Sequence, residues 1–451
     1  MKTAQSAAPS AAPIPGPRSR AAHSAEQQFI APGLQRIAQL SELTIERGRG
    51  STLVDADGNE YLDFFAGVAV ASLGHAHPRY VRALQAQLEK WTVGSFTSEA
   101  RLALLELLAE LAPGELSRTQ LYSGGAEAVE AALRLAKSYT KKFEVVGFWG
   151  GFHGKTAGVM GLIGDEWKQH WGPLPTGTHL VPYADCYRCP LKLTHPDCGL
   201  ACVEETRSVI RNQTGGRVAA IVVEPMQGTA GNVIPPPGFI AEIRGVAKEN
   251  GALFIADEMI TGFGRTGKFW GVEHDGIVPD VMTCGKGIGG GFPLAALVST
   301  DELTKAKPFA NPSGSSSSYG GNPLASAAGL AALEIITTEN LVENSERVGR
   351  KMLERLKSMQ ERQPLIGDVR GKGLLLGVEL VKDRATKELV SKDFTKALFQ
   401  ECLRRGLVAM SYSPIIRINP PLNIKEEEAL EGLDILDEAL TAVTKERGAG
   451  R

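Results

Sequence analysis

Two residues in the second half of the chain, Asp257 and Lys286, have the types and the setting for amine chemistry. Asp257 ends the apolar run FIAD, and Lys286 follows another apolar run, VMTCG. Pyridoxal phosphate requires such a pair: a lysine amine that binds its aldehyde as a Schiff base, and a carboxylate that keeps its ring nitrogen protonated. The two residues therefore predict a pyridoxal-phosphate site at the ends of neighbouring strands.

Two upstream segments offer the other parts of such a site. In SGGAEAVEAALRLAK (123–137), glycines stand at the start of a predicted helix, where backbone N–H groups and the helix dipole favour a phosphate. The segment FHG (152–154) follows a predicted strand and offers an aromatic face that can stack on a ring. These segments indicate where the phosphate and the ring would be held.

The segment TGFGRTGKF (261–269) imitates two nucleotide-binding motifs, and we interpret it as an irregular loop. Its glycines fit GxGxxG, but no strand leads directly through them into a helix, as a dinucleotide site requires. A P-loop needs Ser or Thr after its lysine, and Phe269 stands there.

Composition and charge are those of an ordinary globular enzyme. The 451 residues include 49 Lys+Arg and 51 Asp+Glu, so the formal net charge is −2, and 43% are hydrophobic. These values exclude global disorder and the basic excess of a nucleic-acid binder. No apolar stretch approaches the roughly 18–20 residues that span a bilayer, and six cysteines are too few for a disulfide scaffold. We expect a cytoplasmic enzyme with neither nucleic-acid nor membrane partners.

Glycine is the one unusual component, at 51 residues. That is about 11% of the chain, against an average near 7%. Many of them gather in five segments: 124–125, 147–161, 262–271, 285–291 and 320–321. A backbone that must approach a phosphate or flank a reactive lysine favours glycine, so this distribution outlines one cofactor pocket.

Hydrophobic patterning predicts an α/β fold with a mainly parallel central sheet, because buried apolar strands alternate with amphipathic helices. The predicted strands are 143–149, 217–225, 251–257, 279–285 and 293–299. Amphipathic helices are predicted over 101–111 and 127–142, and a hairpin within 52–70. Two further strands, within 371–381 and 413–424, are expected in a smaller carboxyl-terminal α+β domain.

The same patterns suggest four regions along the chain. Residues 1–28, rich in Ala, Pro and Ser, are expected to form a disordered tail without the features of a secretory signal. Residues 29–75 would join the small domain, 76–325 would form the large cofactor-binding domain, and 326–451 would form the small domain. The Ser/Gly-rich loop 311–323 would mark the boundary or contribute to the active site.

The chain resembles the class III (subgroup II) pyridoxal-phosphate aminotransferases from about residue 45 onward. The motifs that carry the resemblance occur in family order: DADGNEYLDFFAGVAVASLGHAHP, SGGAEAVEAA, GGFHGKT, EPMQG, FIADEMITGFGRTGKFWGVEHDGIVPDVMTCGKGIGGGFPLAALVS, SSSYGGNPLA, VRGKGLLLGVEL and IRINPPLNI. The resemblance implies the type I aminotransferase fold, a homodimer or a dimer of dimers, and active sites at the subunit interface.

The resemblance also assigns roles to individual residues. Lys286 would hold the cofactor and then move the proton between the substrate carbon and the cofactor, and Asp257 would pair with the pyridine nitrogen. Phe152 would stack on one face of the ring. Met259, where the family usually has Val, would pack on the other.

Further residues follow from the same motifs. Gly125 and Ala126 would donate N–H groups to the phosphate, and Ser318 would reach the phosphate of the partner subunit. Arg417 would bind a substrate carboxylate, although a solvated edge-strand arginine is the alternative. His153 and Glu224 also lie in matching motifs. We place them in the cofactor site without assigning a specific role to either.

Two departures from the family motifs bear on the substrate. Branches acting on 4-aminobutyrate and ornithine typically read EPVQGEGG, with a glutamate that pairs with the carboxylate-binding arginine; this chain has Thr229 there. Ile260 replaces a glutamine that hydrogen-bonds the cofactor ring oxygen. Both changes resemble the amine:pyruvate branches, because an arginine without its acidic partner is freer to bind or to swing away.

The expected reaction is therefore transfer of an amino group from a primary amine or ω-amino acid to a 2-oxo acid, pyruvate or 2-oxoglutarate, in a ping-pong sequence. The alternative is another pyridoxal-phosphate reaction on the same fold, by a racemase, aminomutase, decarboxylase or lyase.

One cluster lies outside this scheme. Four cysteines occur within 17 residues as C-x2-C-x8-C-x3-C: Cys186, Cys189, Cys198 and Cys202. Such spacing suits a structural zinc site, and the alternative is a compact reduced loop. We assign no metal to the catalytic site, and the cluster leaves a structural metal open.

Overall fold

A seven-stranded sheet forms the centre of the larger of two compact units in the computed structural model, which describes residues 14–447. Its strand order is β4-β10-β9-β8-β7-β5-β6. The bounds are β4 (Arg118–Tyr122), β5 (Glu144–Phe148), β6 (Thr178–Val181), β7 (Val218–Val223), β8 (Leu253–Asp257), β9 (Val281–Cys284) and β10 (Ala295–Ser299). Strand β10 runs antiparallel to β9 and β4, and β6, β5, β7, β8 and β9 are mutually parallel. The mainly parallel sheet is confirmed.

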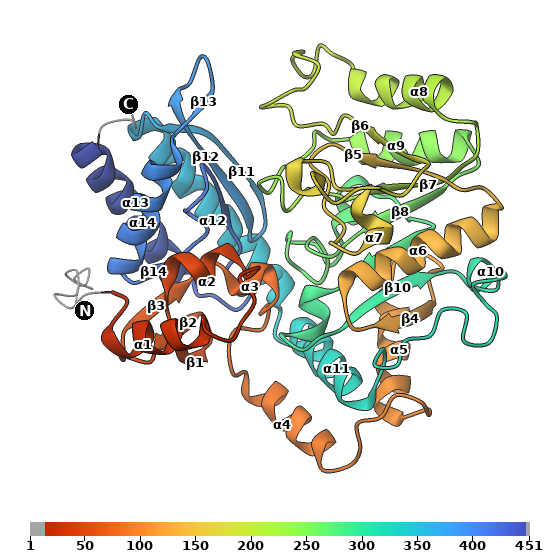
Figure 1. The fold of residues 1–451 in the computed structure, drawn as a ribbon, viewed down its shortest axis with the longest axis horizontal. Coiled ribbons are helices and arrows are strands. Elements are labelled where there is room, and N and C mark those ends of the chain that lie inside the picture. Colours follow the sequence, from red (N-terminus) through yellow and green to blue (C-terminus); the bar gives the residue numbers. More distant parts are fainter. Residues whose placement is uncertain (1–13, 448–451) are drawn as a thin grey trace. The chain divides into compact units, whose positions relative to one another are not determined.

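The central strands are buried along their whole length because helices pack against the sheet. Helix α6 (Gly125–Thr140) lies against β7, β8, β9 and β10, and α9 (Phe239–Glu249) lies against β7 and β8 (Figure 1). Helix α8 (Ala201–Gln213) contacts α9 and the edge strand β6. This α/β layering places the carboxyl ends of the parallel strands at one edge.

The larger unit spans Pro78–Glu343. Its helix α11 (Pro323–Thr338) packs on α4 (Pro78–Leu88) and α5 (Glu99–Leu111) through a largely buried face of Ala, Leu and Ile. The observed unit therefore includes α11. The sequence, by contrast, predicts that the large domain ends at residue 325, just after the Ser/Gly-rich loop. Short elements complete it: α7 (Ala157–Met160), η1 (Glu166–Lys168), η2 (Gly271–Asp275), η3 (Lys286–Gly289) and α10 (Asp301–Thr304).

The smaller unit combines the described residues up to His77 with those from Asn344 onward. One of its sheets has the order β1-β2-β3-β14, from β1 (Ile45–Arg49), β2 (Thr52–Asp55), β3 (Glu60–Asp63) and β14 (Leu407–Val408). The predicted hairpin is confirmed as β2–β3. The other sheet is built from β11 (Ile366–Lys372), β12 (Leu375–Asp383), β13 (Glu388–Leu389) and β15 (Ile415–Ile418). The helices are α1 (Pro17–Glu26), α2 (Arg36–Ser41), α3 (Ala66–Ala69), α12 (Leu341–Arg362), α13 (Lys392–Arg404) and α14 (Glu426–Arg447).

The expectation of a disordered tail is wrong for the segment that forms α1. A carboxylate far along the chain caps this helix: Asp57, in the β2–β3 turn, accepts the backbone N–H groups of Arg18 and Ser19, both at 2.8 Å. The side chain of Ser19 is buried, and its carbonyl accepts the hydroxyl of Thr44. Residues 1–13 of the expected tail lie outside the described residues.

Within the described part of the chain, every helix is too short or too polar to cross a bilayer.

Replacing Asp57 by Ala should loosen α1, because two first-turn N–H groups lose their acceptor. We expect faster amide hydrogen exchange over residues 18–26 and earlier proteolysis there, with the sheet of the larger unit unaffected. Asp57→Asn is the matched control, since its side-chain carbonyl can still accept. Equal exchange in wild type and Asp57→Ala would show that the cap does not hold the helix.

Candidate active site

The structure brings Asp257 and Lys286 to the same edge of the large sheet. Strands β8 and β9 are parallel neighbours, with Asp257 opposite Thr283. Lys286 follows β9 and opens η3 with φ at +47°, in the left-handed region that a non-glycine residue rarely adopts. Such strain persists only where the surroundings impose it, and it gathers at functional sites.

Asp257 is buried at 1% exposure, and each of its oxygens has a partner. One of its oxygens lies 2.6 Å from Nδ1 of His153, and the other accepts the backbone N–H of Met259 at 3.0 Å. Burial alone would lower the pKa of His153, but the hydrogen bond and charge of Asp257 raise it above the ordinary value. Nδ1 of His153 is therefore held against the carboxylate of Asp257.

Glu224, just beyond β7, positions the aromatic residue expected to stack on a ring. Its buried carboxylate accepts the backbone N–H groups of Phe152 and Gly228, both at 2.9 Å. Burial raises the pKa of Glu224. Phe152 is half-buried and meets Trp167 edge-to-face, with ring centroids 6.2 Å apart. The loops after β5 and β7 are thereby tied together.

The thioether of Met259 packs between the start of α6 and the segment that carries Lys286. Its sulfur lies 3.0 Å from where a Cβ on Gly125 would stand, and 2.6 Å from the corresponding point on Gly285. The second distance is shorter than any ordinary Cβ contact, so a side chain at Gly285 would displace Met259. Close backbone approach at two glycines brings three elements together.

The N-terminus of α6 is arranged to receive an anion. Glu127 accepts the backbone N–H groups of Ser123 at 3.0 Å and Gly124 at 2.9 Å. The following N–H groups, of Gly125 and Ala126, lie in the first turn, where a helix has no acceptor of its own. The helix dipole adds a partial positive charge there.

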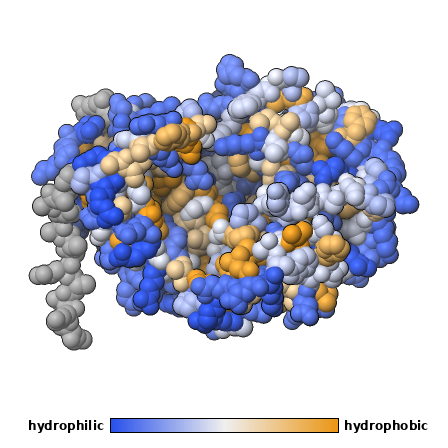
Figure 2. Space-filling view, turned by 60° about the horizontal axis from the view of Figure 1, so that its bottom comes forward, coloured by the Kyte–Doolittle hydropathy of each residue, from blue (hydrophilic) through white to orange (hydrophobic). Residues whose placement is uncertain are grey.

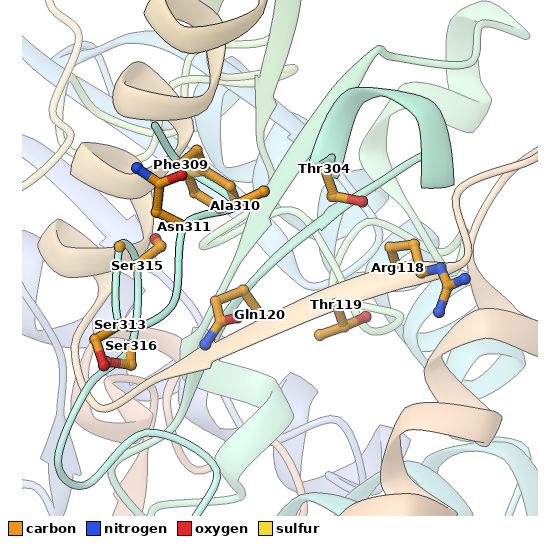
Figure 3. Close-up of a pocket in the computed structure, with 11 residues that line it drawn as sticks. Arg118, Thr119, Gln120, Thr304, Phe309, Ala310, Asn311, Ser313, Ser315 and Ser316 are labelled. Atoms are coloured by element: carbon orange, nitrogen blue, oxygen red, sulfur yellow. The ribbon is translucent and has the colours of Figure 1, made fainter. Parts of the chain in front are cut away.

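Two further predicted residues stand on other elements. Ser318 is exposed, on the loop that leads into α11. Arg417 is half-buried on β15 in the smaller unit, opposite Gly377 of β12. The loop before Ser318 borders a polar pocket of about 340 Å³ beside β4, whose walls include Arg118, Gln120 and Ser315 (Figure 3). That pocket contains none of the predicted site residues.

Comparison with known proteins decides the family. The family model "Aminotransferase class-III" matches residues 35–440. The chain belongs to the class III aminotransferases.

Individual relatives agree with this assignment. A 4-aminobutyrate aminotransferase of Mycobacterium leprae is 36% identical over 408 residues, covering 88% of this chain and 90% of that protein. A leucine/methionine racemase of Thermococcus litoralis is also 36% identical over 408 residues, covering 89% and 91%. An amine transaminase structure from an uncultivated Pseudomonas species, described as PLP-bound, has a TM-score of 0.86 at 29% identity, covering 92% and 98%.

This class III aminotransferase has the type I fold and depends on pyridoxal phosphate. The residues at the sheet edge fit that cofactor. A buried carboxylate backed by His153 suits the ring nitrogen, Phe152 and Met259 offer apolar surfaces, and the start of α6 suits a phosphate. Lys286 would supply the amine.

Sequence reasoning missed Glu258, whose buried carboxylate fixes the loop after β8. It accepts the backbone N–H groups of Gly271 at 2.9 Å and Val272 at 2.8 Å, and the hydroxyl of Thr261. Its own N–H donates to the carbonyl of Thr283 on β9. Burial raises the pKa of Glu258 to about 7, although these donors hold it down. The one sequence feature that could have indicated this role is that Glu258 is a second acidic residue directly after Asp257.

The raised pKa of Glu258 predicts a pH-dependent stability. Between its ordinary pKa of 4.5 and the folded value of about 7, the folded chain holds a proton that the unfolded chain has lost. This contribution is complete below pH 4.5 and is lost as the pH rises through 7, at about 1.4 kcal/mol per pH unit.

Denaturant unfolding from pH 4.5 to 8 measures this contribution. The wild type should lose stability over that window relative to Glu258→Gln, which has no proton to release there. Glu242→Gln, an exposed substitution on α9, should follow the wild type. Parallel curves for the wild type and Glu258→Gln would contradict the raised pKa.

Proposed function

We propose that this aminotransferase moves an amino group from a primary amine or ω-amino acid to a 2-oxo acid, pyruvate or 2-oxoglutarate. The supporting observation is that its two departures from the 4-aminobutyrate-type motifs are neighbours in space. The Cδ1 atom of Ile260 lies 2.8 Å from where a Cβ on Gly228 would stand, and Thr229 is the next residue. An apolar side chain and a neutral one thus replace two polar groups in one place, which favours an uncharged amine tail.

The chain's own residues divide the chemistry between them. Pyridoxal phosphate, when bound, supplies an aldehyde that takes up an amino group and a ring that withdraws electrons. We assign to Lys286 the covalent attachment and the transfer of the proton at the substrate carbon. Asp257, held by His153, would keep the ring nitrogen protonated. Arg417 would bind the carboxylate of the 2-oxo acid.

The racemase relative supports a second candidate, the racemisation of an amino acid. Both reactions need Lys286 and Asp257, and they differ in the fate of the nitrogen. A racemase removes the proton from the substrate carbon and returns one to the opposite face, so the amino group stays on that carbon and no acceptor is needed. Inversion of a pure amino-acid enantiomer without any added 2-oxo acid would favour this candidate.

We also propose that the enzyme is a homodimer, or a dimer of dimers, with Ser318 reaching the cofactor phosphate of the partner subunit. Apolar residues gather in patches on an otherwise hydrophilic face in Figure 2. Large apolar side chains of the larger unit that are more than half exposed include Leu88, Val93, Phe96, Leu102 and Tyr319. Exposed apolar surface of this kind favours association. The six cysteines are free thiols, which suits the reducing cytoplasm that we propose as the location.

Replacing Lys286 by Ala tests the catalytic assignment. Turnover should fall by roughly 10²- to 10⁴-fold or more, because covalent attachment and proton transfer are both lost. The measurement is the half-reaction: an amine donor added to wild-type holoenzyme should convert the bound cofactor to its amino form and release a carbonyl product. Lys248→Ala, on the surface of α9, should match the wild type. Turnover retained in Lys286→Ala would overturn the assignment.

The substrate class is tested at Arg417. We expect Arg417→Ala to raise KM for the 2-oxo acid about 10- to 100-fold, the cost of a charge-assisted hydrogen bond. The half-reaction with an uncharged amine should change far less. Arg404→Ala removes an exposed arginine of α13 and should leave both unchanged. An equal loss with both substrates would exclude carboxylate recognition by Arg417.

A further inference from the structure

The four clustered cysteines line one small cavity in the larger unit. They face a space of about 20 Å³ together with His195. A cavity must offer about 10–15 Å³ to hold one water molecule, so this one accepts a single atom or ion. All four residues carry free thiols. The folded chain therefore places all four cysteines around one cavity.

The segment that carries them is unusual in length. Residues 182–200, between β6 and α8, contain neither a strand nor an α-helix. Loops longer than about 12–15 residues without regular structure are uncommon in compact domains and usually have a function. Backbone turns shape this loop: Cys198 donates to the carbonyl of Thr194 at 2.9 Å, and Lys192 donates to that of Cys189 at 3.0 Å.

His195, which lines the same cavity, has a buried polar atom that also points to a ligand. Nδ1 of His195 is buried and has no hydrogen-bond partner among the described residues. A buried nitrogen without a partner carries a desolvation cost that a ligand would remove. Cysteine sulfur and histidine nitrogen are the donors that zinc and iron prefer in closed protein sites.

The thiols need to turn before all of them can bind one ion. Within the described residues, no three His, Cys, Asp or Glu side chains surround one point closely enough to hold a metal. A cysteine reorients by rotation about a single bond, between staggered positions.

We propose that Cys186, Cys189, Cys198 and Cys202 bind a single thiophilic metal ion, Zn²⁺, and that this centre fixes the 182–200 loop. Each thiol gives up its proton to solvent as its sulfur binds. The two pairs, C-x2-C and C-x3-C, have the ligand spacing of structural zinc sites.

The loop is anchored beside the catalytic residues, which gives the centre a structural consequence. Tyr183 donates its hydroxyl to the carbonyls of Glu224 and Pro225, both at 3.1 Å, and its ring meets Phe239 at 5.1 Å. Since the carboxylate of Glu224 positions Phe152, a fixed loop supports the side chain that faces the ring.

Metal analysis of the holoenzyme tests the proposal. The protein is purified without chelator and without air, from cells grown with added zinc and iron. We expect about one zinc per chain. Less than about a tenth of an equivalent of zinc, or iron with acid-labile sulfide in its place, overturns the proposal.

Variants locate the metal. The double variant Cys198→Ser/Cys202→Ser should lose about nine-tenths or more of the metal, while Cys402→Ser, which removes a cysteine of the smaller unit, should keep it. Metal retained by the double variant overturns the assignment to these residues.

A measurement on the wild type avoids any failure of the variants to fold. Cys186 is exposed, yet a bound metal would protect it from a thiol reagent. We expect its reaction in the native protein to become about tenfold faster once the metal is removed. An unchanged rate overturns the proposal.

Discussion

The burial of Asp257 is the constraint on which the larger unit depends. A carboxylate with 1% exposure is tolerated only when donors surround it. His153 and the backbone N–H of Met259 supply them, and both lie in loops at the carboxyl ends of parallel strands. His153 is itself buried, next to Glu224, whose carboxylate holds Phe152 in turn. One buried charge thus sets the positions of three loops, after β5, β7 and β8.

A second constraint is the closeness of the backbones around Met259. Its sulfur fits only because Gly125 and Gly285 lack side chains. This contact joins the anion-binding start of α6 to the segment of Lys286, whose left-handed backbone is costly by itself. Glu258 also fixes the loop after β8, because its carboxylate accepts the N–H groups of Gly271 and Val272. Lys286 therefore rests on rigid surroundings, as the proton transfer proposed for it would require.

The cysteine loop joins this frame through Tyr183. Tyr183 connects the carbonyl of Glu224 to the start of a long loop without regular structure. Its ring lies in an aromatic cluster with Phe148 and Phe239. A loop of this length gains little from its own apolar contacts, and a bound metal is one of the few ways to order it. Tyr183 would then connect the stability of the loop to the position of the catalytic residues.

The sequence by itself determined the buried strands, the parallel sheet and the family. Apolar runs long enough to be buried on both faces identify central strands. Residues at the carboxyl ends of such strands must meet at one edge, so the placement of Asp257 and Lys286 at the same edge follows from the sequence alone. The edge strands β4 and β6 were not predicted, because RTQLY and THLV carry polar residues on their exposed sides and show no continuous apolar run.

Only the tertiary structure decided which partners these residues have. Asp57 caps α1 from 39 residues away, and that contact orders a segment whose composition indicates a tail. The roles of Glu258 and Met259 likewise come from backbone groups of other segments, to which no local pattern refers. Sequence patterns report the periodicity of burial. A hydrogen bond or a close contact depends on where two distant segments meet, and the folded chain alone sets that position.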